Sequence, residues 1–316
     1  MNALRIGEER MASDCIVDKE HAGCRLDSFL ALFFPDFGLR ARRRAILNGW
    51  VLVNGRLPKA STKLALGDVV RVCEQVYDVP LGVRLLARRG DYFFFLKPPC
   101  LHTLSLAGSN EPSLALAVTA LCAEQGIYPV PELVQRLDFE TSGIVLGLEH
   151  SRVSAFRCAE DEGRVRKLYL ALLEGELARE CTVTAALNTD SRRKTLLLPR
   201  ASSPERHTNI RPLAHFSTDV PLESLDPALF NNAHSPLTLT LALCTIACGA
   251  RHQIRAHAAS LGHPLFGDTL YGAQGRSKRF YLHAAGLILP ETSFFERPEW
   301  LSPCSLWTLC SKTRDC

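Results

Sequence analysis

The segment VQRLDFETSGIVLG, residues 134 to 147, places an arginine and an aspartate inside an otherwise apolar stretch. Charges in an apolar setting are costly unless they are paired or put to use. The triplet Arg25-Leu26-Asp27 has the same letters, so only the surroundings can show what Arg136 and Asp138 do. Apolar runs on both sides predict two strands joined by a turn at 141–143, with Asp138 at the end of the first strand.

The composition of the whole chain is that of an ordinary globular protein. Its 316 residues are 47% hydrophobic and 22% charged, which excludes disordered and fibrous classes and allows two domains. No apolar run reaches the ~18 residues of a membrane span, and the charged start is unlike a secretory leader. The twelve cysteines form no C-x-x-C pair. We therefore expect free thiols in a reducing cytoplasm rather than disulfides or zinc.

The N-terminal region reads as a small α/β module. Apolar residues recur with helical spacing over 26–33, and Arg25 and Asp27 flank that apolar face as solvated charges. A second helix is expected over 39–47. It is followed by a short strand with an Asn54-Gly55 turn and by another strand in GDVVRV.

Positive charge is concentrated in this module. Between Arg40 and Val72 the charge is +7, so the rest of the chain carries −3 of the total +4. The basic residues in this segment are Arg40, Arg42, Arg43, Arg44, Arg56, Lys59, Lys63 and Arg71. Such a concentration suits a polyanion partner, although a solvated charged face is the alternative.

Residues 12–75 as a whole resemble the S-four-type RNA-binding domain, in which two small helices with a basic edge precede strands around V-x-V-N-G and G-D. That resemblance implies a set of RNA contacts at Arg40, Arg42, Arg43, Arg44 and Lys63. Residues 76–90 read as a linker to the region that follows.

The second region predicts an α+β fold, a mixed and largely antiparallel sheet flanked by helices. Alternating or buried apolar runs predict strands in YFFFLK, KLYLALLEGEL and LTLTLALCT, of which the last, 237–245, is the clearest. Helical spacing predicts helices over 113–124, over 151–166, and in ARHQIRAHAASLG, which Gly262 closes. Residues 190–236 have no clear pattern and are expected to hold insertions.

Three separated polar insertions are candidates for chemistry: Arg136 with Asp138, Lys167 with Tyr169, and His252 with Arg255. A carboxylate at the end of a strand needs a cation to stay ionised, and Arg255 is the best placed candidate on its helix. From the residues alone, however, an Asp–Arg pair is more often structural than catalytic, and a tyrosine on a strand is more often part of the core.

Other sites are less well supported. The chain has no glycine-rich nucleotide loop, no H-E-x-x-H and no G-x-S-x-G. His252, His257 and His263 are spaced by five and six residues, so they do not share one helix face and no metal site is predicted.

Five motifs in order resemble those of the RluA-type pseudouridine synthases. RLDFETSGIVLGLE is similar to their signature H-R-L-D-x-x-T-S-G. The others are Lys97-Pro98, the K-x-Y-x-A match at 167–171, GARHQIRAHAASLGHPLFGDTLYG at 249–272, and Leu282-His283-Ala284. Together they cover about residues 92 to 290, within an expected catalytic domain at 91–295 and before a tail at 296–316.

The resemblance implies isomerisation of uridine to pseudouridine in RNA, without cofactor or metal. It implies that Asp138 acts on the ribose, that Arg255 holds Asp138 ionised, and that Tyr169 stacks on the target base. Arg136 would fill the gap left by the flipped-out uridine, and His252 belongs to the expected RNA contacts. The S-four-type module is typical of members acting on large-subunit ribosomal RNA, and we expect a cytoplasmic monomer.

The chain departs from the family pattern at three places. Gln135 stands where histidine is usual, Ala250-Arg251 replaces Arg-Thr, and Cys100 replaces a common glycine. These departures put in doubt any RNA contact that the missing arginine would make. Two alternatives remain: a non-catalytic RNA-binding or ribosome-assembly factor on the same fold, and a glycosidase-like enzyme. The latter needs two carboxylates, and Glu140 is close to Asp138 in sequence.

Overall fold

The computed structural model describes residues 13–34, 38–47, 51–56, 58–72, 82–105, 111–191, 193–217, 238–273, 277 and 280–301. The chain divides into two compact units. Unit 1 comprises residues 1–139 and 147–149, and unit 2 comprises residues 140–146 and 150–316. The domain limits expected from the sequence, at 75, 91 and 295, stay predictions.

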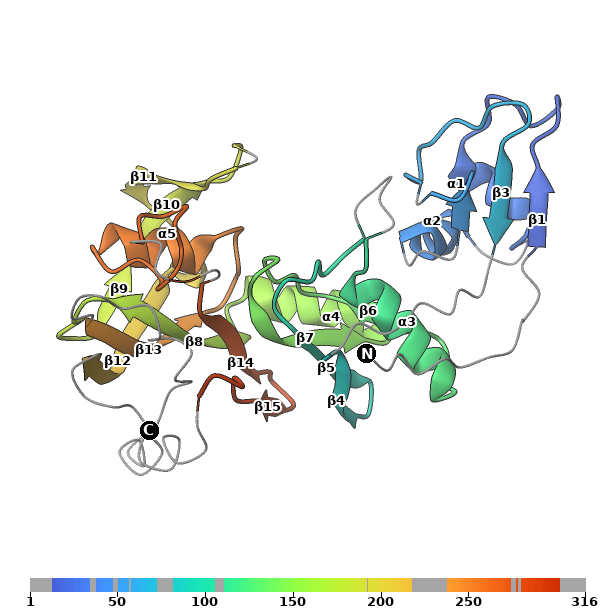
Figure 1. Cartoon of the computed structure of the whole chain (residues 1–316). Helices are drawn as coiled ribbons and strands as arrows, with labels where there is room; N and C mark the ends of the chain where they lie inside the picture. Colours follow the sequence, from blue (N-terminus) through green and yellow to red (C-terminus); the bar gives the residue numbers. More distant parts are fainter. Residues whose placement is uncertain are drawn as a thin grey trace. The chain divides into compact units, whose positions relative to one another are not determined.

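The N-terminal segment of unit 1 is a three-stranded antiparallel sheet with helices packed beside it (Figure 1). Its elements are β1 (Ser13–Ile16), α1 (Leu26–Phe29), η1 (Leu30–Leu32), α2 (Leu39–Leu47), β2 (Val51–Val53) and β3 (Val69–Val72), with strand order β1-β3-β2. The apolar residues of α1 and η1 pack against Ile46, Val51 and Val70 in one core. The expected helices and strands of this module are confirmed.

The expectation that Asp27 is solvated is wrong. Its side chain has no exposure, and Arg25 donates to it through Nε (3.0 Å) and Nη2 (2.7 Å). Arg43 of α2 adds a third hydrogen bond from Nε (2.8 Å). The hydrogen bonds from Arg25, aided by Arg43, lower the pKa of Asp27 to about 2. A buried carboxylate is tolerated because it is paired in this way, which the helical pattern alone does not reveal.

The remainder of unit 1 contains a β-hairpin and one long helix. Its elements are β4 (Arg84–Arg89), β5 (Tyr92–Lys97), α3 (Leu114–Glu124), β6 (Glu132–Leu133) and the end of β7 (Ser142–Leu148). Ser113 caps α3 by accepting a hydrogen bond from the Leu116 N–H (3.3 Å), so the helix expected over 113–124 is confirmed. Over the described ranges, no helix is long and apolar enough to cross a membrane.

The first strand expected around Asp138 is much shorter than its apolar pattern indicates. β6 ends at Leu133, and residues 134–138 form no strand. The turn lies at 139–140, and β7 begins inside the expected turn at Ser142. The backbone of Leu137 is bonded to a side chain, that of Thr103, so it does not extend a sheet ladder.

Unit 2 is built on a large mixed sheet that is mostly antiparallel, as expected. Its strand order is β7-β14-β8-β13-β12-β9; β7 and β14 run parallel, and the described pairs β14-β8, β8-β13, β13-β12 and β12-β9 run antiparallel. The strands are β8 (Arg166–Glu174), β9 (Cys181–Val183), β12 (Thr208–Ser217), β13 (Thr238–Ile246), β14 (Leu282–Ile288) and β15 (Ser293–Phe295), which pairs with β14. The helices are α4 (His150–Asp161), η2 (Pro204–Arg206) and α5 (Gln253–Ser260).

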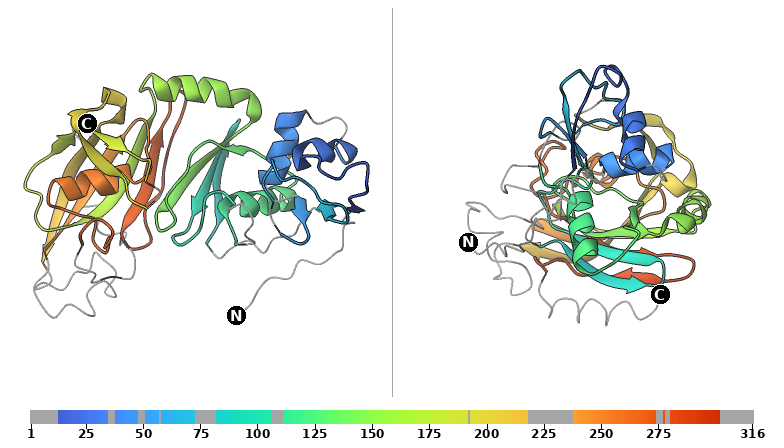
Figure 2. Two further views of the ribbon diagram at one scale, coloured as in Figure 1. Left: turned by 90° about the horizontal axis from the view of Figure 1, so that it is seen from above. Right: turned by 90° about the vertical axis from the view of Figure 1, so that its right-hand side faces the viewer.

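Both faces of this sheet are buried where β8 runs, and successive apolar residues of β8 point to opposite faces. Ala171 and Leu173 join a core cluster with Ile254 and Ala258 of α5. Leu170 and Leu172 join a cluster on the opposite face, with Phe266 and Trp300. Figures 1 and 2 show α5 (orange) beside the strands of unit 2, and α5 contacts β12. Burial of such side chains is worth about 1.5–3 kcal/mol each.

The region without a clear sequence pattern contains regular structure. β10 (Ala185–Asn188) and β11 (Leu196–Ala201) form a separate antiparallel pair, and β12 follows η2. Figure 1 shows this pair next to α5, which contacts β11. β11 is exposed along much of its length and contains Pro199, so it lacks the buried alternation of a core strand.

Gly143 allows β7 and β14 to approach closely. Its φ is +119°, and a Cβ there would lie 2.4 Å from the carbonyl oxygen and 2.5 Å from the nitrogen of Ala284. Neither backbone atom can move aside without disturbing the sheet. The glycine of the T-S-G motif is therefore required by both conformation and space.

We expect Gly143→Ala to lower the free energy of unfolding by more than about 2 kcal/mol, because the methyl group overlaps β14 and the φ is unfavourable. The measurement is urea unfolding. Gly249→Ala is the matched control, because a Cβ there meets only ordinary contacts at 3.6 and 3.9 Å. Equal stability of the two variants would contradict the assignment.

Candidate active site

The backbone on both sides of Asp138 is held by side chains of unit 1. Thr103 Oγ1 donates to the carbonyl oxygen of Leu137 (2.9 Å) and accepts from its N–H (3.0 Å). The carbonyl oxygen of Phe139 accepts from Lys97 Nζ (3.1 Å) and from the N–H of Leu101 (3.2 Å). The residues before and after Asp138 are thus both held by hydrogen bonds. This restricts the orientation of the half-buried Asp138 side chain.

Lys97 is a fully buried cation with an unusual set of partners. Its Nζ donates to the carbonyl oxygens of Leu101 (2.7 Å), Pro98 (3.0 Å) and Phe139 (3.1 Å). Burial lowers the pKa of Lys97 to about 7, while the negative charge of Asp138 opposes that shift. The Lys97-Pro98 motif thus provides an amine that is electrostatically coupled to Asp138 and holds the turn after it.

Residues next to Asp138 divide into buried and exposed. Gln135, which stands where the family has histidine, is buried, whereas Arg136 is exposed. Phe139 is 45% exposed, and its ring lies against His102 at 4.6 Å between centroids. The exposed positions of Arg136 and Phe139 are compatible with contact to a ligand, but the role expected for Arg136 stays a prediction.

In unit 2, Arg255 has a carboxylate partner that the sequence analysis overlooked. Its Nε and Nη2 donate to Asp268 Oδ2 (2.6 Å) and Oδ1 (2.8 Å), and both side chains are buried. The guanidinium also lies over the rings of Phe280 (4.3 Å) and Tyr271 (5.1 Å). The expected pairing of Arg255 with Asp138, which belongs to unit 1, stays a prediction.

Of the other expected residues of unit 2, His252 lies near the same groups and Tyr169 lies in the sheet. His252 precedes α5, and its Nδ1 is 3.2 Å from Tyr271 Oη. Tyr271 Oη also accepts from the Thr195 N–H (2.8 Å). Tyr169 is half-buried on β8, between Cys244 of β13 and Ala284 of β14.

Asp268 and Tyr271 were within reach of sequence reasoning. Both belong to the quoted motif at 249–272, in its G-D-x-x-Y-G part. Neither was given a role, because their contacts with Arg255 and His252 depend on a loop after α5 whose path the sequence does not show.

The histidines considered for a metal site are instead engaged with protein groups. His257 Nδ1 is 2.7 Å from Thr208 Oγ1 and its Nε2 is 3.1 Å from the Ala185 carbonyl oxygen. His263 Nδ1 is 2.9 Å from the carbonyl oxygen of Glu174. Within the part of the chain that is described, no group of three or more His, Cys, Asp or Glu side chains could hold a metal ion, and the cysteines there are free thiols.

We expect the stability advantage of the wild type over Lys97→Met to grow as the pH rises from about 7 to 10. The folded-state pKa of Lys97, about 7, lies below the ordinary value of 10.5, so in this window the unfolded chain binds more protons. The free energy of unfolding then rises with pH, by at most about 1.4 kcal/mol per unit. Urea unfolding across this range is the measurement. A difference that does not change with pH, as expected for the exposed control Lys19→Met, would show that Lys97 does not titrate there.

The comparisons with known proteins agree with the motifs. The model of the RNA pseudouridylate synthase family matches residues 93–260. An uncharacterized RNA pseudouridine synthase of Chloroflexus aurantiacus is 26% identical, covering 98% of this chain and 95% of that protein. The ribosomal large subunit pseudouridine synthase C of Vibrio cholerae is 28% identical, covering 86% of each chain.

A solved structure resembles the same region. Human RNA pseudouridylate synthase domain containing 1 has a TM-score of 0.51 at 22% identity, covering 74% of this chain and 96% of that one. This likeness supports the fold alone. Because the family model matches more than half of the sequence, the chain belongs to the RNA pseudouridylate synthase family.

Proposed function

We propose that this chain is an isomerase that converts uridine to pseudouridine in large-subunit ribosomal RNA. Family membership supports the reaction, and relatives named as ribosomal large subunit pseudouridine synthases support the substrate. The observation that carries the catalytic assignment is the pair of anchors around Asp138, formed by Thr103 and Lys97. Positioning of a reacting group in this way is a major source of catalysis.

The reaction needs no external oxidant or reductant. The bond from ribose C1′ to uracil N1 breaks, the base turns, and a bond from C1′ to C5 forms, while the C5 proton is lost and N1 gains one. Asp138 acts on the ribose, either by attack at C1′ or by proton removal that leads to a glycal-like intermediate. Both routes require its ionised form.

The remaining residues would bind and orient the nucleotide. Tyr169 stacks on the target base, and Arg136 enters the space that the flipped-out uridine leaves in the RNA. Arg255 assists Asp138 electrostatically while Asp268 keeps the guanidinium in place. His252 contributes a contact to RNA. In this proposal the protein works as a cytoplasmic monomer.

The N-terminal segment is proposed to be an S-four-type RNA-binding module. The sheet, the helices and the charge of residues 13–72 support it. The second candidate function, a non-catalytic RNA-binding or assembly factor, is less favoured because the aspartate of the signature motif is present and anchored.

We expect Asp138→Asn to abolish pseudouridine formation and to leave RNA affinity within about twofold. The substitution removes the negative charge of the side chain while keeping nearly the same size. Pseudouridine in large-subunit ribosomal RNA is mapped in cells with the wild-type gene, without it, and with this variant. Glu140→Gln is the matched control, since an amide oxygen can still accept from the Phe280 N–H (3.2 Å). Turnover by Asp138→Asn would refute the assignment, and loss of turnover in both variants would favour a two-carboxylate mechanism.

We expect the basic residues of the N-terminal segment to include both RNA contacts and a structural residue, Arg43. The triple variant Arg40→Gln, Arg44→Gln, Lys63→Gln should bind RNA more weakly, with a salt slope reduced by about 2 to 3. Arg43→Gln should instead lower stability, because it leaves buried Asp27 with Arg25 alone. RNA binding over a range of salt and thermal unfolding are the measurements. Unchanged affinity of the triple variant at every ionic strength would show that this edge is no RNA footprint.

A further inference from the structure

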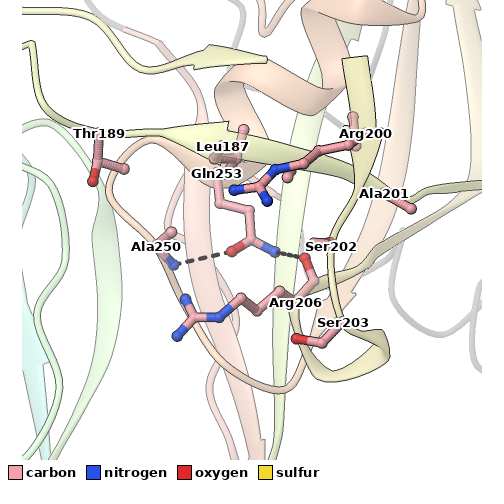
Figure 3. A pocket seen from close by; sticks show the side chains of 11 residues that line it. Leu187, Thr189, Arg200, Ala201, Ser202, Ser203, Arg206, Ala250 and Gln253 are labelled. Carbon is pink, nitrogen blue, oxygen red and sulfur yellow. Dashed lines mark hydrogen bonds between the residues drawn. The ribbon is translucent and has the colours of Figure 1, made fainter. Parts of the chain in front are cut away.

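Unit 2 contains a hollow of about 370 Å³ next to the start of α5. The β10–β11 pair, the segment leading into η2, and the residues before α5 surround it (Figure 3). Arg200 of β11 and Arg206 of η2 line it, and Figure 3 shows both side chains extending toward the same side of the hollow. The hollow is separate from the contacts of Arg255 and Asp268 described above.

The walls of the hollow are held by hydrogen bonds. Gln253, which is buried, donates from Nε2 to the Arg206 carbonyl oxygen (2.8 Å) and to Thr208 Oγ1 (3.0 Å), and its Oε1 accepts from the Ala250 N–H (3.0 Å). Arg251 donates to the carbonyl oxygen of Thr189 (3.1 Å) in the segment after β10. The segments that carry Arg206 and Thr189 are therefore both fixed to the start of α5.

The charged side chains that line the hollow are both positive. Both arginines are exposed, and no hydrogen bond or salt bridge joins either guanidinium to another residue in the described ranges. Of the described residues that line the hollow, none is acidic. The carboxylate of Glu205, next to Arg206 in sequence, accepts a hydrogen bond from the Ser203 hydroxyl and attracts Arg206 electrostatically without forming a salt bridge with it. Two guanidinium groups on one hollow suit an anion, since they can present forked donors to phosphate oxygens.

Ala250, one of the residues that line the hollow, departs from the family motif. The motif at this position has arginine, and here the side chain is a methyl group that lines the hollow. An arginine at position 250 would extend into the same space. The two arginines that line the hollow, Arg200 and Arg206, come instead from the region without a clear sequence pattern.

We propose that Arg200 and Arg206 bind a phosphodiester group of the substrate RNA in this hollow. The inference rests on the proposed function and deepens it by adding an RNA contact outside the expected site residues. A backbone phosphate is favoured over a small ligand because both arginines are solvent-exposed, whereas small-ligand pockets bury most of the ligand and are mainly apolar. Phosphate contacts of this kind fix the register of the nucleic acid without reading its sequence.

The test uses the full chain and the double variant Arg200→Gln, Arg206→Gln. Binding of a labelled hairpin from large-subunit ribosomal RNA is measured by fluorescence anisotropy over a series of potassium chloride concentrations. We expect affinity to fall about tenfold near 0.1 M salt, and the slope of log K against log salt to shrink by about 0.7 to 0.9, the value for one neutralised phosphate. Turnover at saturating RNA should persist, and thermal unfolding should be unchanged.

The matched control is Arg166→Gln with Arg179→Gln, which removes the same charge from other exposed positions of unit 2. The proposal is overturned if the Arg200 and Arg206 variant keeps its affinity and slope, or if the control lowers both equally. Inorganic phosphate is titrated in parallel. If the double variant loses phosphate binding and keeps its RNA affinity, the result identifies a free-phosphate site and rejects the RNA contact.

The same assay separates this inference from the proposed function. Pseudouridine formation by the wild type is measured on the same RNA. If the wild type shows none on any large-subunit fragment, the proposed function fails. If it forms pseudouridine and the double variant binds like the wild type, only the phosphate contact fails.

Discussion

The buried ammonium group of Lys97 is the interaction on which the Asp138 region depends. It donates hydrogen bonds to two nearby carbonyl oxygens, of Pro98 and Leu101, and to that of Phe139, which is 42 residues away and immediately follows the aspartate. A cation without partners in such a place would be strongly unfavourable. The three carbonyl oxygens provide the hydrogen bonds that the buried amine needs. The turn at 139–140 must therefore keep the Phe139 carbonyl oxygen within reach of Lys97.

Among the buried charged residues of the described part of the chain, Asp27, Lys97 and Arg255 are stabilised in three different ways. Asp27 is enclosed by two arginines, Lys97 by main-chain oxygens, and Arg255 by a carboxylate and two aromatic rings. The first joins α1 to α2, and the third joins α5 to the loop that follows it. For Asp27 and Arg255, removal of the charged partners would leave a buried charge without compensation, which costs more than the pair itself contributes.

The regular parts of the fold could be predicted from the sequence, because their signals are local. α3 was predictable from its apolar spacing and Ser113, and the two-sided burial of β8 from its alternation. The burial of Asp27 was not, since it depends on Arg43 sixteen residues away. The early end of β6 was not predictable either. The backbone of Leu137 is hydrogen-bonded to the side chain of Thr103, which is 34 residues away in the sequence.

The partners of Lys97 have a consequence for how the sequence can diverge. All three acceptors are peptide oxygens, which every amino acid provides. Replacing Leu101 or Phe139 with another side chain leaves the acceptor in position, provided that the backbone path is kept. Substitutions of the neighbouring side chains therefore preserve this geometry, whereas substitution of the lysine removes all three hydrogen bonds at once.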